Sequence, residues 1–247
     1  MTAVRSALVA VLVLAGCTSG AAGSEPPQTV AESGSGSAGP AAERGTGAEG
    51  AFPAYVVRVH RIGPGLRTRM HDSYRPVCPV PLRELRYLRL RFIGFDGRAH
   101  LGELVVRKRF ATDVGAVFER LYDARWPIRR MRLVDDYAGV DERSMAADNT
   151  AGFNCRRIAG GAVWSRHAYG EAIDVNPAEN PYLTASAVHP RSASRFVLID
   201  RSLGARVPTG SIRADDVVVR AFASIGWEWG GAWTGLKDYQ HFAAPAG

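Results

Sequence analysis

Residues 88–92 (Leu-Arg-Leu-Arg-Phe) alternate strictly between apolar and basic side chains. A period of two is typical of a strand that buries one face. Residues 95–97 (Phe-Asp-Gly) have the composition of a turn, and a second apolar stretch continues to Val106. The pattern therefore predicts a β-hairpin in this part of the chain.

Two later segments have the spacing of amphipathic helices. We expect the first to begin with Thr112 as its N-cap and to end before Pro127. Its buried face consists of four apolar residues: Val114, Val117, Phe118 and Leu121. We expect the second over residues 215–225, with Gly226 as its C-cap. Residues 128–134 are predicted to form a strand. Because strands and helices do not alternate regularly, the sequence predicts an α+β fold with a largely antiparallel central sheet and flanking helices.

The first residues of the chain have a different pattern. Arg5 precedes an apolar run over residues 7–15, which is too short to span a bilayer and is typical of a signal peptide. The run ends in Leu-Ala-Gly-Cys at residues 14–17, which resembles the bacterial lipobox, where cleavage leaves a lipidated cysteine. We therefore predict a lipoprotein signal peptide over residues 1–16 and a lipid on Cys17 that anchors the protein to the outer surface of the cell membrane. An ordinary secretory signal with a chance cysteine is the alternative.

The segment that follows is rich in Gly, Ala, Ser, Pro and Glu as far as residue 50. It has almost no large apolar residue with which to offset the entropy cost of ordering. We predict that residues 17–50 form the lipidated cysteine and a disordered tether, and that residues 51–247 form one folded domain.

The chain has 31 Lys and Arg residues against 24 Asp and Glu residues, a net charge of +7, and its lysines are Lys108 and Lys237. Such a charge suits polyanions, including nucleic acid, wall polymers and lipid headgroups. The arginines are scattered, however, and no stretch has the pattern of a nucleic-acid-binding module. We expect a solvated basic surface and no nucleic-acid partner.

Two cysteines remain in the predicted domain, Cys78 and Cys155. Export would permit a disulfide between them, and an even number of cysteines fits one. Two buried thiols are the alternative.

Two polar stretches contain candidate metal ligands. His167, Asp174 and His241 offer two imidazoles and one carboxylate. Hydrolytic zinc sites use three protein ligands and leave a fourth position for water. Gly170, between the first two ligands, suits a loop that folds back into a strand. Asp238, three residues before His241, is close enough to accept a proton from the attacking water.

These residues predict one Zn²⁺ per chain, although Asp174 could instead serve as a turn or salt-bridge residue. The remaining histidines are interpreted as ordinary polar residues: His60, His71, His100 and His189.

The order Ser-x-His-x-x-Gly-x-Ala-x-Asp over residues 165–174, followed by Trp-Gly and then Asp-x-x-His at residues 238–241, resembles the D-Ala-D-Ala metallopeptidases. That family contains zinc D,D-carboxypeptidases, dipeptidases and phage L-alanyl-D-glutamate endolysins, with a hedgehog-like fold. The resemblance covers about residues 78–242 and is greatest to extensin-like and actinobacterial members. It implies that His167, Asp174 and His241 bind zinc and that Asp238, where the family often has glutamate, is the general base.

The resemblance also implies roles in substrate binding. In the family, an arginine ahead of the first zinc histidine binds substrate and stabilises the oxyanion, and Arg156 matches it, with Arg157 as the alternative. Ser165 matches a serine that hydrogen-bonds the substrate, and a simple turn hydroxyl is the alternative.

Three further residues have expected places near the motifs. We expect Trp227 in the core and Trp229 in the floor of the substrate cleft. Glu171 is interpreted as a solvated strand residue, with orientation of a ligand histidine as the alternative.

Together these observations predict an extracytoplasmic zinc metallopeptidase that hydrolyses peptidoglycan stem peptides, with D-Ala-D-Ala carboxypeptidase activity favoured and no obligate protein partner. An L-Ala-D-Glu endopeptidase is the alternative within the family. A non-catalytic, lipid-anchored wall-binding protein is a second alternative, but Asp238 argues against it because a pure binder needs no base beside the metal. A structural lipoprotein with chance motifs would require two independent coincidences.

Overall fold

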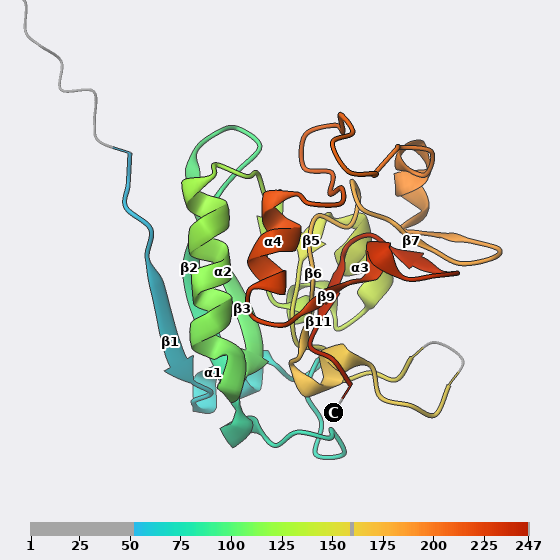
Figure 1. Ribbon diagram of the computed structural model, residues 1–247. Helices are drawn as coiled ribbons and strands as arrows, with labels where there is room; N and C mark the ends of the chain where they lie inside the picture. The colour runs from blue at the N-terminus through green and yellow to red at the C-terminus, as the bar shows by residue number, and fades with distance from the viewer. Residues whose placement is uncertain (1–51, 159–160, 247) are drawn as a thin grey trace, which may run out of the picture. The chain divides into compact units, whose positions relative to one another are not determined.

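The computed structural model describes residues 52–158 and 161–246, so the predictions for residues 1–16 and 17–50, Cys17 included, lie outside the described residues. Within the described ranges, strands form three antiparallel three-stranded sheets and one parallel pair, accompanied by four α-helices (Figure 1). The predicted α+β fold class is confirmed. No helix in this part of the chain is long and apolar enough to cross a membrane.

The first sheet has the order β1-β2-β3, with β1 over Val57–Arg61, β2 over Leu85–Ile93 and β3 over Ala99–Arg107. Strands β2 and β3 are the predicted hairpin, and Gly97 in the turn between them has a φ of 71°. Helix α2 (Ala111–Asp123) lies against this sheet (Figure 1). Its predicted apolar face is fully buried. The helix begins one residue before Thr112, which lies in the first turn rather than at the N-cap.

The second predicted helix is shorter than expected. Helix α4 covers Val217–Ala223, and it packs against α2. Asp215 cannot belong to the helix because its φ of 63° is left-handed. At the other end the C-cap is Ser224, and Gly226, with a φ of 75°, lies beyond it.

The strand predicted over residues 128–134 is also shorter. Strand β4 covers Arg130–Met131 and pairs in parallel with β5 (Asn149–Thr150). After Met131 the side chain of Asn149 replaces the backbone ladder, because its amide accepts from the N–H of Arg132 at 2.8 Å and donates to the carbonyl of Arg132 at 3.0 Å.

A second antiparallel sheet, of order β6-β11-β9, carries the candidate site. Its strands are β6 (Ala172–Asp174), β11 (His241–Ala243) and β9 (Glu228–Trp229). The remaining α-helices and strands are α1 (Pro64–Arg69), α3 (Asp141–Ala146), β7 (Tyr182–Leu183), β8 (Val188–His189) and β10 (Lys237–Asp238). Six short 3-10 helices occur in the described ranges: η1 (Leu82–Glu84), η2 (Lys108–Phe110), η3 (Val134–Tyr137), η4 (Arg166–Tyr169), η5 (Arg191–Phe196) and η6 (Gly230–Ala232).

The main hydrophobic core joins the hairpin and its helices to the sheet of the candidate site. Phe222 of α4 stacks on Phe242 of β11 with 4.2 Å between ring centroids, and Phe118 of α2 meets Phe222 edge to face. Trp227 belongs to this core, as the sequence predicted. Each fully buried large apolar side chain contributes about 1.5–3 kcal/mol. The two strands that carry the candidate ligands Asp174 and His241 are therefore packed against this core.

A smaller core surrounds a disulfide between Cys78 and Cys155, whose Cα atoms are 5.8 Å apart. Phe153 and Val80 are buried in the same cluster. The bond links the segment before β2 to the residue that directly precedes Arg156.

Candidate metal centre

Three segments bring the predicted ligands together. His167 lies in η4, Asp174 at the end of β6 and His241 at the start of β11, and the antiparallel register places His241 directly opposite Asp174. Between η4 and β6 the chain reverses at Gly170, whose φ is 67°. A Cβ at this position would lie 2.6 Å from the backbone nitrogen of Arg107, so both the conformation and the space require glycine.

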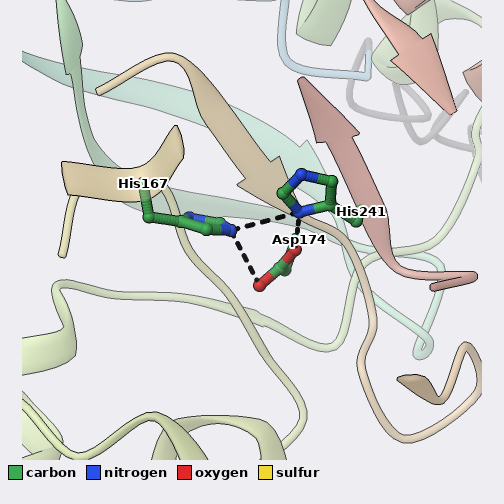
Figure 2. A group of neighbouring side chains, drawn as sticks. All are labelled: His167, Asp174 and His241. Carbon is green, nitrogen blue, oxygen red and sulfur yellow. Dashed lines mark hydrogen bonds and ion pairs between the residues drawn. The ribbon is translucent and has the colours of Figure 1, made fainter. Parts of the chain in front are cut away.

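The donor atoms of the three side chains converge on one point (Figure 2). Nε2 of His167 lies 3.3 Å from Nδ1 of His241 and 3.2 Å from Oδ2 of Asp174, and Nδ1 of His241 lies 3.0 Å from Oδ1 of Asp174. Two nitrogen donors on a tetrahedral zinc ion are about 3.3 Å apart, given Zn–N bonds of about 2.0–2.1 Å. The donor set and its spacing therefore fit zinc.

The tautomer of His167 is fixed by its surroundings. Its Nδ1 lies 2.7 Å from the carbonyl oxygen of Gly152, and a carbonyl can only accept a hydrogen bond. Nδ1 must therefore carry the proton, and in the neutral ring the lone pair of Nε2 faces His241 and Asp174. Metal-binding histidines are usually oriented in this way, by a hydrogen bond from the nitrogen that does not bind the metal.

His167 and His241 are buried, Asp174 is half-buried between them, and the charges of the three groups interact strongly. Burial by itself lowers the pKa of His167, but the charge of Asp174 and its hydrogen bond outweigh it, so the pKa lies above its usual value. Burial by itself raises the pKa of Asp174, but the two histidines hold it well below its usual range. Asp174 is therefore ionised, as a metal ligand must be.

Asp238 lies in β10, which pairs with β7. Burial, together with the charge of Asp174, raises its pKa to about 7, although the charges of His241 and Arg156 oppose the rise. Its Oδ1 is buried without a hydrogen-bond partner among the described residues. A buried, unpaired carboxylate oxygen beside a ligand cluster is suited to accept a proton from a water molecule or a substrate.

Arg156 also lies near the cluster. Its charge is close enough to lower the pKa of both His167 and Asp238. Its Nε forms an ion pair with Asp141 in the first turn of α3. Asp141 additionally accepts from Nδ2 of Asn154 at 2.8 Å. The sequence alone gave Asp141 and Asn154 no role, since neither belongs to a ligand motif. The one available clue to Asp141 was that an arginine in a cleft needs a carboxylate partner.

Asp141 and Asn154 also border a small cavity of about 10 Å³ that His167 and Asp174 line. A cavity of this size holds about one water molecule.

The other predicted site residues have structural contacts of their own. Ser165 is buried and its Oγ accepts from the backbone N–H of His167 at 3.3 Å, so it caps η4; its contact with substrate remains a prediction. Trp229 is buried and donates from Nε1 to the carbonyl of Tyr239 at 2.8 Å. Arg157 stacks on Trp164 at 4.4 Å instead of sharing the environment of Arg156.

The interpretation of Glu171 as a solvated residue is wrong. Only 4% of Glu171 is exposed, and it pairs with Arg109 at 2.7 Å, Arg166 at 2.9 Å and Arg107 at 3.7 Å. The three arginines come from separate segments, β3, η2 and η4, so the local sequence around Glu171 did not reveal them. Glu171 thus anchors the start of β6 to the end of β3.

A second group of potential ligands consists of His71, Asp72 and Asp135. Oδ1 of Asp135 already accepts from the backbone N–H groups of Asp72 and Ser73, at 3.0 and 2.9 Å, and His71 is exposed. This group therefore ties the loop after α1 to η3.

Comparison with known proteins agrees with this geometry. Residues 159–244 match the model of the D-alanyl-D-alanine carboxypeptidase family. This part of the chain is similar to that family, which supports a peptidase and hence a hydrolase. The matched segment contains all three converging ligands and Asp238. A search of curated proteins and a search of solved structures found no match.

Proposed function

We propose that the protein is a zinc-dependent peptidase that hydrolyses the stem peptides of peptidoglycan, and that it favours removal of a terminal D-Ala. The observation that carries the proposal is the convergence of His167 Nε2, His241 Nδ1 and the Asp174 carboxylate, with the tautomer of His167 set by Gly152. The similarity of residues 159–244 to D-alanyl-D-alanine carboxypeptidases supports the choice of substrate.

His167, Asp174 and His241 would hold the ion. When bound, zinc supplies a Lewis acid and lowers the pKa of water towards neutrality. The carboxylate of Asp238 would then accept a proton from the attacking water and deliver this proton to the leaving amine. Because its carboxylate has a pKa near neutrality in the metal-free protein, it can both take up and release a proton.

Arg156 supplies the positive charge for the substrate. Its guanidinium carries donors that match an oxyanion or a carboxylate. In the structure its Nε is held by Asp141, and 34% of its side chain is exposed. Asp141 thus positions the arginine while leaving part of it accessible.

An endopeptidase would use the same centre. Its substrate would continue as peptide chain at the place where the substrate of a carboxypeptidase ends in a carboxylate. The two activities are separated by incubating the zinc-loaded protein with a defined pentapeptide stem and determining the products by mass spectrometry. We expect loss of a single alanine from the C-terminus. Cleavage between L-Ala and D-Glu would establish the endopeptidase instead, and an intact peptide with zinc bound would contradict peptidase function.

We also propose that the protein acts outside the cytoplasmic membrane, anchored by a lipid on Cys17. The support for this comes from the sequence of residues 1–17.

A further inference from the structure

A cavity of about 740 Å³ lies beside β9, η6 and β10, and the metal ligands do not line it. Its aromatic walls are formed by Trp229, Trp233 and Tyr239, among others. Pockets for small ligands and peptide side groups commonly have volumes of about 300–1,000 Å³ and apolar walls with a few polar groups. The size and lining of this cavity fall within that range.

One polar group of the cavity is the guanidinium of Arg201, which is 7% exposed. It lies 4.3 Å from the ring of Tyr239 and donates to the backbone carbonyls of Ile212 at 2.6 Å and Glu179 at 2.7 Å. Its Nε has no hydrogen-bond partner within the described ranges, and it forms no ion pair with a carboxylate there. Burial lowers the pKa of Arg201 to about 10, so it remains charged at neutral pH.

The second cation is Lys237, whose Nζ donates to the carbonyls of Gly231, at 3.1 Å, and Trp233. It too has no ion pair with a carboxylate of the residues that the structure describes. A cation that is paired with neutral carbonyls alone retains its full charge, and a ligand carboxylate would compensate it.

Two carboxylates also line the cavity. Asp215 is engaged by Arg213 at 2.8 Å, and Glu228 is exposed to solvent. Among the described residues, the two cations of the lining, Arg201 and Lys237, therefore donate hydrogen bonds to neutral oxygens only.

The cavity adjoins the candidate metal centre. Lys237 and Tyr239 line the cavity, whereas Asp238 between them does not, and it lies close enough to His241 and Asp174 for their charges to affect its pKa. The ring of Trp233 lines the cavity and also lies 5.5 Å from the ring of His241. A peptide advances about 3.3–3.6 Å per residue, so one substrate can occupy both places.

We infer that this cavity binds a carboxylate-bearing residue of the peptide substrate, with Lys237 as the residue that selects for the negative charge. The inference rests on the proposed peptidase function and adds to it the acidic character of the substrate. Trp233 lines the cavity beside the ring of His241, and Arg201 adds a second positive charge to the lining.

The test uses two stem pentapeptides that differ in one group: the free carboxylate of the D-Glu residue is left as the acid or converted to the amide. KM and kcat are measured for both with the zinc-loaded full chain, and binding is measured separately by calorimetry. We expect the acid to have a KM about five- to tenfold lower than the amide, the effect of one charge-assisted hydrogen bond that is partly exposed to solvent. Lys237→Gln should abolish this difference, and Lys237→Arg should retain it.

Lys108→Gln is the matched control, because it removes the other lysine, which is exposed in η2, outside the cavity lining. A variant that is merely destabilised would weaken both peptides equally and leave the acid-to-amide ratio unchanged. An equal KM for the two peptides in the parent, or an unchanged ratio in Lys237→Gln, would overturn the inference while leaving the peptidase function intact. Binding that prefers the acid without any cleavage would contradict the peptidase function and leave the cavity assignment intact.

Discussion

Individual residues of the centre differ in what their surroundings do to their charge. Asp174 is half-buried between two histidines and stays ionised, whereas Asp238 has a raised pKa and a buried Oδ1 that has no hydrogen-bond partner in the described part of the chain. Two carboxylates whose environments separate their pKa values are suited to different tasks. Here the ionised carboxylate is suited to binding a metal, and the other to moving a proton.

The role of Asp238 is tested by Asp238→Asn, which preserves size but cannot accept a proton. Because none of the three converging ligands changes, we expect zinc content to stay at that of the parent while kcat falls by about 10²–10⁴-fold. Zinc is measured by atomic absorption and turnover with the pentapeptide stem. Asp123→Asn, on the exposed end of α2, is the control and should match the parent. If Asp238→Asn retained nearly full activity, Asp238 would not be the base.

At the residue level, the sequence predicted which three side chains converge, because His167, Asp174 and His241 occur in spaced motifs with distinctive chemistry. It did not predict Asp141, whose contact with Arg156 joins residues 15 positions apart through the packing of α3. It also misjudged Glu171, because its arginine partners come from β3, η2 and η4. Contacts of this kind depend on the fold rather than on local sequence.

Among the secondary-structure elements, β5 and β6 support the centre and are connected at one end by a pair of buried acids. Asp148, before β5, accepts from the N–H of Ala178 at 2.9 Å. Glu179, after β6, is 4% exposed, and Arg129 lies 3.5 Å from Asp148 and 3.8 Å from Glu179. Burial and the neighbouring Asp148 raise the pKa of Glu179 to about 8, although Arg129 opposes the rise.

This pKa predicts how stability depends on pH. The usual pKa of a glutamate is 4.5, so between pH 4.5 and about 8 the folded protein binds up to one more proton at Glu179 than the unfolded chain. The contribution of Glu179 to the free energy of unfolding is therefore greatest below pH 4.5 and falls as pH rises towards 8, by at most about 1.4 kcal/mol per pH unit. Glu179→Gln should lose this slope and gain stability relative to the parent at pH 8.

Urea unfolding between pH 5 and pH 9 measures the difference between Glu179→Gln and the parent at each pH. Glu119→Gln on the exposed face of α2 serves as the control and should show the pH dependence of the parent. A constant difference between Glu179→Gln and the parent across this range would mean that the carboxyl is not protonated in the folded protein.

Longer helices and strands were predictable because many of their residues follow the same spacing of apolar positions. The β2–β3 hairpin and α2 each bury a continuous apolar face, and both were predicted with boundaries close to those observed. The short strands β4 and β5 have two residues each and depend on a side-chain bridge from Asn149. A two-residue strand is too short to show a repeating pattern of apolar and polar positions, so its extent is set by tertiary contacts.

On the scale of the whole molecule, the chemistry and the predicted anchor lie in different parts of the chain. The converging ligands and the large cavity belong to residues 167–241, whereas the predicted lipobox ends at Cys17. The two can therefore be tested separately. A variant that affects only the anchor should leave the peptidase activity of the purified protein unchanged.

Cys17→Ser is that variant, because a hydroxyl replaces the sulfur that the lipid requires while the size of the residue is preserved. Lipoprotein anchors carry several acyl chains, and their loss should abolish stable membrane binding. We expect the variant to remain unprocessed or to be released into the medium, whereas the parent sediments with membranes. Fractionation and the intact mass of the N-terminal peptide measure both outcomes. Thr29→Ala, in the predicted tether, is the control and should be retained like the parent. Normal processing and unchanged membrane retention of Cys17→Ser would show that another feature of the protein holds it there.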